Sequence, residues 1–478
     1  MGARSTSDAS AVGGAGFPPR ATGLYDPAVT TVGSPSAQDP VARSGLPPER
    51  LVELYRLMAL ARALDERAWI LNRSGRVHFV ISGQGHEGAE AGVTAALTPG
   101  RDWLLPYYRS MTGVMAMGMT PREVMLQQYG KADDPGSGGR QMPSHYGHAG
   151  HRIFSSSSPV ATQVLHAAGI ALAAKLRGVQ EVALVAMGEG SSNQGDVHEA
   201  LNFAGVHRLP MILLVENNGY AISVPAELQS AVRDVAVRAA GYAMPGVVVD
   251  GSDVIGCYLA ARDAVARALA GEGATFIEAK VTRLTGHSSD DQQTKYRSAE
   301  ELADQRGQDP LPRFRDELRA AGVLSEAAEA GIAAEVAAAV DDATEFAEAS
   351  PDPDPATLLH HVYAEPGDPV PGPPPAHLAG GVAFNSTPDV TNPPGSNEAN
   401  AERKVPALID GSGALDDGSG PSSATILPPG TPSPRGVASN ASAPGGTGPE
   451  GATAAPGAPV PGPQLAADDA GPPPAGSA

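Results

Sequence analysis

Hydrophobic side chains in the middle of the chain follow two periods, which predict alternating helices and strands. After the pair Pro47–Pro48, apolar residues recur every three or four positions, the spacing of one helix face: Leu51, Leu54, Met58, Ala61 and Leu64. Short runs that are almost entirely apolar predict buried strands at 182–187, 211–216, 247–250 and 275–284, and a helical pattern occupies 253–269. Such strands separated by helices are typical of an α/β fold with a parallel sheet covered by helices on both faces.

The two ends of the chain lack both periods. Residues 1–45 and 367–478 are rich in Gly, Ala, Ser and Pro. Such stretches bury too little apolar surface to offset the entropy lost on ordering, so we expect two disordered tails. Between them, residues 46–366 are expected to form one domain, which ends with a helix-rich stretch at 318–349 and proline breakers at 351–355.

Charge and cysteine content narrow the classes of function. The chain has 33 Lys and Arg against 53 Asp and Glu, a formal net charge of −20, which argues against nucleic acid or an anionic membrane as a partner. The single cysteine, Cys257, excludes an internal disulfide and a multi-cysteine metal site, and we expect it to be a small buried helix residue. Apolar runs stay shorter than the roughly 20 residues of a membrane span, so we expect a cytoplasmic protein.

One segment carries most of the chemical information. Gly188–Glu189–Gly190 follows a predicted strand, and 27 positions separate Gly190 from Asn217, where the next strand ends in Asn217–Asn218. That distance lets one helix return the chain to an adjacent parallel strand, so both strand ends should meet at one edge of the sheet. There Glu189 and the amide oxygen of Asn218 can share Mg²⁺, which prefers oxygen ligands and often keeps phosphate oxygens among them. Gly-Glu-Gly alone fits an ordinary turn; the spacing to the Asn pair is much more specific.

These residues resemble the thiamine-diphosphate fingerprint of the alpha subunits of 2-oxo acid dehydrogenases. Further blocks that resemble the family follow in family order at 105–109, 138–143, 157–163 and 283–291. The resemblance covers roughly residues 48–365 and leaves out both tails. It implies a thiamine-diphosphate-binding fold.

Position by position, the resemblance implies a site for thiamine diphosphate and Mg²⁺. Glu189, Asn218 and the carbonyl of Tyr220 match the family's magnesium ligands. Tyr108 and Arg109 match the pair on the cofactor diphosphate, where a guanidinium suits phosphate oxygens, although Arg109 taken alone would be assigned to a surface ion pair. The other matching cofactor contacts are Gly190, Ser191 and two residues whose backbone holds the aminopyrimidine ring, Ser158 and Val160.

The resemblance also implies a catalytic histidine and a second cation. His287 matches the family histidine that lies next to the reacting centre and contacts the cofactor. A histidine in a loop is usually just solvated, but this one follows a predicted strand in a polar loop; His145 and His151 are the alternatives. A potassium site, present in part of the family, corresponds to Ser157, Pro159, Thr162 and Gln163.

The family resemblance also implies an activity and partner chains. The cofactor adds to the keto carbon and takes up the electrons released with CO₂. The glutamate that activates it comes from another chain in this family, which implies a beta subunit, an alpha-two beta-two heterotetramer and a lipoyl acyltransferase that accepts the acyl group. Glu189 and the loop 287–291 resemble branched-chain members, so the expected small-molecule substrates are 3-methyl-2-oxobutanoate and its homologues.

Two alternatives remain open from the sequence. Within the family, the chain could serve a pyruvate or acetoin dehydrogenase. In another class, it could be a non-catalytic Rossmann-type nucleotide-binding module, but Gly188–Asn193 lacks the third glycine of that motif, and the Asn pair has no role there. The chain also departs from some family members, which carry Arg where Glu216 stands, so a diphosphate contact from this position is absent.

Overall fold

The computed structural model describes residues 29–32 and 39–362, and both the start of the chain and the expected tail at 367–478 lie outside these residues. Its centre is a six-stranded parallel sheet in the order β1-β7-β8-β4-β3-β2. The strands are β1 (Thr30–Val32), β2 (Trp103–Leu105), β3 (Ala183–Gly188), β4 (Met211–Asn217), β7 (Gly246–Asp250) and β8 (Thr275–Lys280). The expected α/β fold is confirmed.

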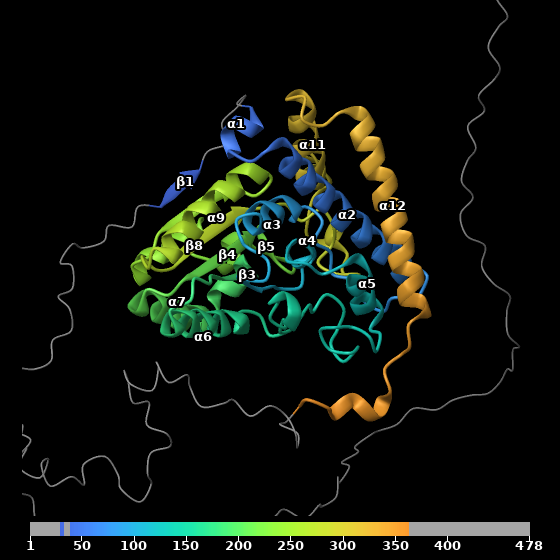
Figure 1. The fold of residues 1–478 in the computed structure, drawn as a ribbon, viewed down its shortest axis with the longest axis horizontal. Coiled ribbons are helices and arrows are strands. Elements are labelled where there is room, and N and C mark those ends of the chain that lie inside the picture. Colours follow the sequence, from blue (N-terminus) through green and yellow to red (C-terminus); the bar gives the residue numbers. More distant parts are fainter. Residues whose placement is uncertain (1–28, 33–38, 363–478) are drawn as a thin grey trace, which may run out of the picture. The chain divides into compact units, whose positions relative to one another are not determined.

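Helices cover both faces of the sheet, because the central strands are apolar on both sides. On one face, Leu184, Ile212 and Ile277 pack against the larger helical layer, and on the other Val185, Leu213 and Phe276 pack against the smaller one. The two layers lie on opposite sides of the sheet in Figure 1. The larger layer comprises α2 (Pro48–Arg73), α3 (Glu87–Thr94), α4 (Met111–Ala116), α5 (Pro121–Tyr129), α9 (Val254–Leu269), α11 (Pro310–Ala320) and α12 (Glu326–Ala349). The smaller layer comprises α6 (Thr162–Arg177), α7 (Gly195–His207) and the 3-10 helix η3 (Val235–Tyr242).

Short elements complete the chain. A two-stranded hairpin, β5 (Tyr220–Ala221) and β6 (Val224–Pro225), follows β4 directly. The others are helices α1 (Pro40–Ser44), α8 (Ala226–Gln229) and α10 (Ala299–Arg306), with 3-10 helices η1 (Ala149–His151), η2 (Glu189–Asn193), η4 (Gln293–Lys295) and η5 (Pro355–Leu359). Among the helices of residues 29–32 and 39–362, none is long and apolar enough to cross a membrane.

Regular structure begins before the expected boundary at residue 46. Strand β1 lies at the sheet edge, where Thr30 pairs with Val247 of β7. Helix α1 is attached to α9 by a buried ion pair between Arg43 and Asp253, the residue that also caps α9. Three- and five-residue elements are too short to show a hydrophobic period, so they were not predicted.

Three other sequence predictions compare directly with the structure. The helix predicted at 253–269 is α9, whose buried residues include Cys257, as expected. The strand predicted at 275–284 ends at Lys280, and the chain then runs irregularly toward His287. Strand β2 was not predicted; it pairs with β3 and brings residues 106–109 to the same sheet edge as Glu189.

Candidate active site

The fingerprint residues lie where β3 and β4 end. These strands are parallel neighbours, with Gly188 opposite Glu216, so the residues after each strand emerge at one sheet edge. The backbone N–H of Asn218 donates to Oε2 of Glu189 over 3.3 Å. A Cβ on Gly190 would stand 2.7 Å from the Cβ of Ala221, so this glycine lets η2 approach the hairpin closely. The approach predicted from the 27-residue spacing is present.

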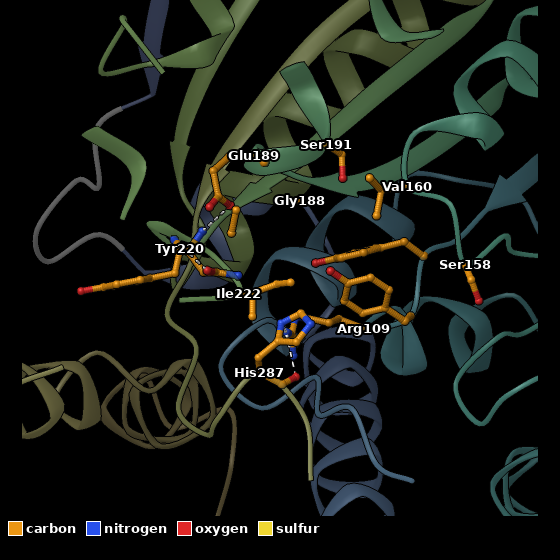
Figure 2. A pocket seen from close by; sticks show the side chains of 14 residues that line it. Arg109, Ser158, Val160, Gly188, Glu189, Ser191, Tyr220, Ile222 and His287 are labelled. Carbon is orange, nitrogen blue, oxygen red and sulfur yellow. Dashed lines mark hydrogen bonds between the residues drawn. The ribbon is translucent and has the colours of Figure 1, made fainter. Parts of the chain in front are cut away.

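A cavity of about 340 Å³ opens at this edge, and Figure 2 shows the side chains around it. Every residue expected to contact cofactor or magnesium lines it: Tyr108, Arg109, Ser158, Val160, Glu189, Gly190, Ser191, Asn218, Tyr220 and His287. Four further residues line the cavity without having been assigned a contact from the sequence: Tyr107, Gly188, Ala221 and Ile222. Tyr107 and Gly188 are direct neighbours of expected residues, which was the available signal, whereas Ile222 reaches the cavity only through the hairpin.

Glu189 is suited to a cation. Its side chain is buried, and burial raises the pKa of its carboxyl above the usual value. It accepts hydrogen bonds from neutral amides, the N–H of Asn218 and the side chain of Gln229 at 3.3 Å each. A buried carboxylate with neutral partners is costly unless a cation compensates it, so the residues present fit a magnesium ion.

The two asparagines have different surroundings. The side chain of Asn217 points toward the protein interior. Its NH₂ group donates to Oε1 of Glu278 over 2.7 Å, and its oxygen accepts the N–H of Gly219 over 3.0 Å. Gly219 has φ +81°, which favours glycine in this turn. Asn218 lines the cavity, and its Oδ1 accepts the N–H of Tyr220 over 3.2 Å. A carbonyl oxygen has two lone pairs, so one remains for a metal.

Arg109 and His287 face the cavity together, although 178 positions separate them. One guanidinium nitrogen of Arg109 lies 3.1 Å from Nδ1 of His287, and the other donates to the carbonyl of Ser82. Arg109 is only 3% exposed, so the alternative of a surface ion pair is wrong. Burial, followed by the charges of Arg109 and Arg283, lowers the pKa of His287 to about 4. The imidazole is therefore neutral near pH 7.

Glu216, where some family members carry arginine, lies behind the cavity and is fully buried. Its Oε2 contacts Nδ1 of His86 at 2.6 Å and accepts the hydroxyl of Tyr107 over 2.9 Å. Burial raises the pKa of Glu216 to about 8, and burial with the charge of Glu216 raises the pKa of Glu90 well above its usual value. Two adjacent buried carboxyls cannot both ionise, so this pair holds a proton.

The residues matched to potassium lie around the start of α6, and none of them is among the cavity-lining residues of the described chain. Thr162 Oγ1 donates to the carbonyl of Pro159 over 3.2 Å. Gln163 is buried, donates to the carbonyl of Ala186 over 3.0 Å, and has a side-chain oxygen without a hydrogen-bond partner in the described structure. Ser157 is in the same loop, and the unpartnered oxygen of Gln163 is suited to a cation.

The two alternative histidines are placed differently. Nε2 of His145 lies 2.7 Å from the hydroxyl of Ser158, beside the cavity but not lining it. His151 is grouped with His148 and Glu123. There Nδ1 of His148 accepts the N–H of His151 over 3.2 Å, and Nε2 lies 3.2 Å from Glu123. These bonds account for both nitrogens of His148, so the group carries no argument for a metal.

Comparison with known proteins identifies the family. The family model described as "Dehydrogenase E1 component" matches residues 55–356. The chain belongs to this family. It is 49% identical over 321 residues to the 2-oxoisovalerate dehydrogenase subunit alpha of Bacillus subtilis (strain 168), covering 67% of this chain and 97% of that one.

Two further relatives are also named as alpha subunits of this kind of dehydrogenase. The 3-methyl-2-oxobutanoate dehydrogenase subunit alpha of Mycobacterium tuberculosis (strain CDC 1551 / Oshkosh) is 37% identical over 333 residues, 70% of this chain and 88% of the relative. The mitochondrial 2-oxoisovalerate dehydrogenase subunit alpha of Homo sapiens is 37% identical over 322 residues, 67% and 72% of the two chains.

The inferred membership among the alpha subunits of branched-chain 2-oxo acid dehydrogenases is thus confirmed. An E1 component alpha subunit works with thiamine diphosphate, a beta subunit and other members of a complex. The Rossmann-type binding module is excluded as an alternative, because the match places 55–356 in an enzyme family.

Proposed function

We propose that this chain is the alpha subunit of an enzyme that oxidatively decarboxylates 3-methyl-2-oxobutanoate and its branched homologues and transfers the acyl group to lipoamide of an acyltransferase. The observation that carries this proposal is one cavity in which the Glu189–Asn218 pair and the Arg109–His287 pair face the same space. The relatives named for this substrate, 49% and 37% identical, support the substrate class.

The anchoring role belongs to the residues at the strand ends. Glu189, Asn218 and the carbonyl of Tyr220 would hold Mg²⁺, and Arg109 with Tyr108 would neutralise and orient the diphosphate. The guanidinium keeps its proton, so its charge is available at every working pH. Ser158 and Val160 would hold the aminopyrimidine ring on the opposite wall. The oxygens of Ser157, Pro159, Thr162 and Gln163 would stiffen that wall around K⁺.

Thiamine diphosphate, when bound, supplies the carbon nucleophile and the electron sink for decarboxylation. His287 is neutral, with Nδ1 facing a guanidinium N–H of Arg109, so its proton is on Nε2. From there it can donate a hydrogen bond to the substrate carbonyl oxygen and handle a proton when the acyl group leaves. Arg109 thus has two roles, since it binds phosphate and sets the tautomer of His287.

A partner chain completes the site. Within the part of the chain that the structure describes, Glu189 is the one carboxylic acid lining the cavity, and it is assigned to the metal. In the family, the acid that activates the aminopyrimidine comes from another chain, and the lack of a second carboxylic acid among the described lining residues agrees with an alpha-two beta-two heterotetramer that has its sites between subunits. A cytoplasmic location, expected from the sequence, stays a prediction.

The test compares substrates on the reconstituted alpha and beta subunits. We expect kcat/KM for 3-methyl-2-oxobutanoate to exceed the values for pyruvate and acetoin by about 10–200-fold, the range that small apolar differences achieve. A preference for pyruvate of tenfold or more would overturn the branched-chain assignment and favour the second candidate, a pyruvate dehydrogenase alpha subunit. Cofactor binding to the same preparation tests the thiamine site independently.

A further inference from the structure

A line of buried side chains runs from the proposed magnesium ligand Asn218 into the protein. The side-chain nitrogen of Asn218 lies 3.5 Å from Nε2 of His86. The other ring nitrogen of His86, Nδ1, lies 2.6 Å from Oε2 of Glu216. His86 and Glu216 are both 0% exposed, so water does not compete for these contacts.

Glu216, the residue of this series farthest from the cavity, determines which atoms along the series are donors and which are acceptors. The hydroxyl of Tyr107 lies 2.9 Å from Oε2 of Glu216 and 3.2 Å from Nδ1 of His86. The proton that Glu216 shares with Glu90 lies in the hydrogen bond between those two carboxyls, which leaves Oε2 of Glu216 as an acceptor. Oε2 faces Nδ1 of His86, so Nδ1 carries the imidazole proton. A neutral imidazole then has a lone pair on Nε2. That lone pair attracts the NH₂ end of the Asn218 amide and repels its oxygen. The oxygen of Asn218 is therefore turned away from His86, to the side where the N–H of Tyr220 lies.

We infer that His86 is a positioning residue that holds the amide of Asn218 with its oxygen toward the metal, an inference that rests on the proposed magnesium anchor. Groups behind a metal ligand commonly orient it in this way, and losing them costs about 10–100-fold in metal affinity. Glu216 acts one step further back by setting the tautomer of His86. An arginine at 216 would present donors to Nδ1 and remove this acceptor.

The position of His86 at the start of α3 does not by itself require an imidazole side chain. His86 stands at the N-cap position of α3, where a side chain often accepts a backbone N–H, but it makes no such cap bond. Both of its nitrogens instead face residues about 130 positions away, at the end of β4. The side chain thus links the start of α3 to the strand end that carries the ligand.

Two substitutions of His86 test its contact with Asn218 separately from its contact with Glu216. In His86→Gln, the amide oxygen occupies the place of Nε2 and can still accept from Asn218. In His86→Asn, the shorter amide reaches the place of Nδ1 and can face only Glu216. We expect His86→Asn to weaken Mg²⁺ about 10–100-fold and His86→Gln to retain most of the affinity. The measurement is the Mg²⁺ dependence of thiamine diphosphate binding, by calorimetry, to the reconstituted alpha and beta subunits.

A double-mutant cycle distinguishes positioning from a general loss of stability. In the Asn218→Asp background, which keeps an oxygen for the metal, His86→Asn should cause no further loss of Mg²⁺ affinity, because there is no amide left to orient. A further loss as large as in the wild-type background would overturn the inference, as would equal affinities for His86→Asn and His86→Gln. If Asn218→Ala itself leaves Mg²⁺ affinity unchanged, the anchor proposal fails instead.

A second pair of variants covers the case in which both His86 variants fail to fold. Glu216→Gln keeps an acceptor for Nδ1 of His86 and should keep the Mg²⁺ affinity. Glu216→Leu removes the acceptor, frees the tautomer, and should weaken Mg²⁺ binding. Equal Mg²⁺ affinities in these two variants would contradict the inference. Thermal unfolding of each variant without cofactor checks that the fold is retained.

Discussion

Arg109 donates from one guanidinium nitrogen toward both Nδ1 and the carbonyl oxygen of His287, at 3.1 and 3.2 Å. The loop of His287 is held from the other side by Asp291, which accepts the N–H of His287 over 2.6 Å. These contacts place a neutral imidazole at the cavity wall.

Replacing His287 with Ala should reduce acyl transfer to lipoamide about 10²–10⁴-fold, the usual contribution of a positioned proton donor. Cofactor affinity should change much less, because Glu189, Asn218 and Arg109 remain. The two quantities are measured by lipoamide acylation in single turnover and by calorimetry. An equal loss in both would show that His287 acts mainly in binding.

The pH dependence follows from the pKa of His287, which is lowered to about 4 in the folded chain. Between pH 6.5 and 4 the unfolded state binds more protons at this position than the folded state, so the stability contributed here is lost as the pH falls through that window. The free energy of unfolding of the cofactor-free alpha chain should therefore decrease less on acidification in His287→Gln than in the wild type. Parallel pH profiles for the two proteins would contradict the lowered pKa.

Glu189→Ala and Asn218→Ala should each abolish Mg²⁺-dependent retention of thiamine diphosphate while leaving the circular dichroism spectrum unchanged, because both side chains face the cavity. Glu199→Ala is the matched control, since Glu199 is an exposed carboxylate on the neighbouring helix α7. Unchanged cofactor affinity in both site variants would remove the magnesium assignment.

The purified alpha chain by itself should release no CO₂ from 2-oxo acids, because the activating glutamate is expected from the beta subunit. Adding the beta subunit should restore turnover, followed with a dye acceptor. Measurable turnover by the alpha chain alone would show that it contains a complete site.

Deleting residues 367–478 should leave activity and melting temperature close to the full-length values, because that stretch has almost no periodic apolar pattern. Limited proteolysis of the full-length chain should remove it first. A fall in melting temperature of more than a few degrees would indicate that the deleted stretch packs on the domain.

The amino-acid sequence determined the parts of this protein that depend on local patterns. The apolar runs at 182–187 and 211–216 predicted β3 and β4, and the spacing between Gly190 and Asn217 predicted that Glu189 and Asn218 would meet, because a parallel βαβ unit brings both strand ends to one edge.

Only the tertiary structure decided what depends on distant residues. The three-residue strand β1 is stabilised by pairing with β7 and has too few residues for a period. The ring nitrogens of His86 and His287 contact partners 130 and 178 positions away, which no spacing rule relates. Ile222 lines the cavity because a hairpin after β4 turns it there. Hydrogen-bond direction and burial are properties of assembled neighbours, so they appear only once the chain has folded.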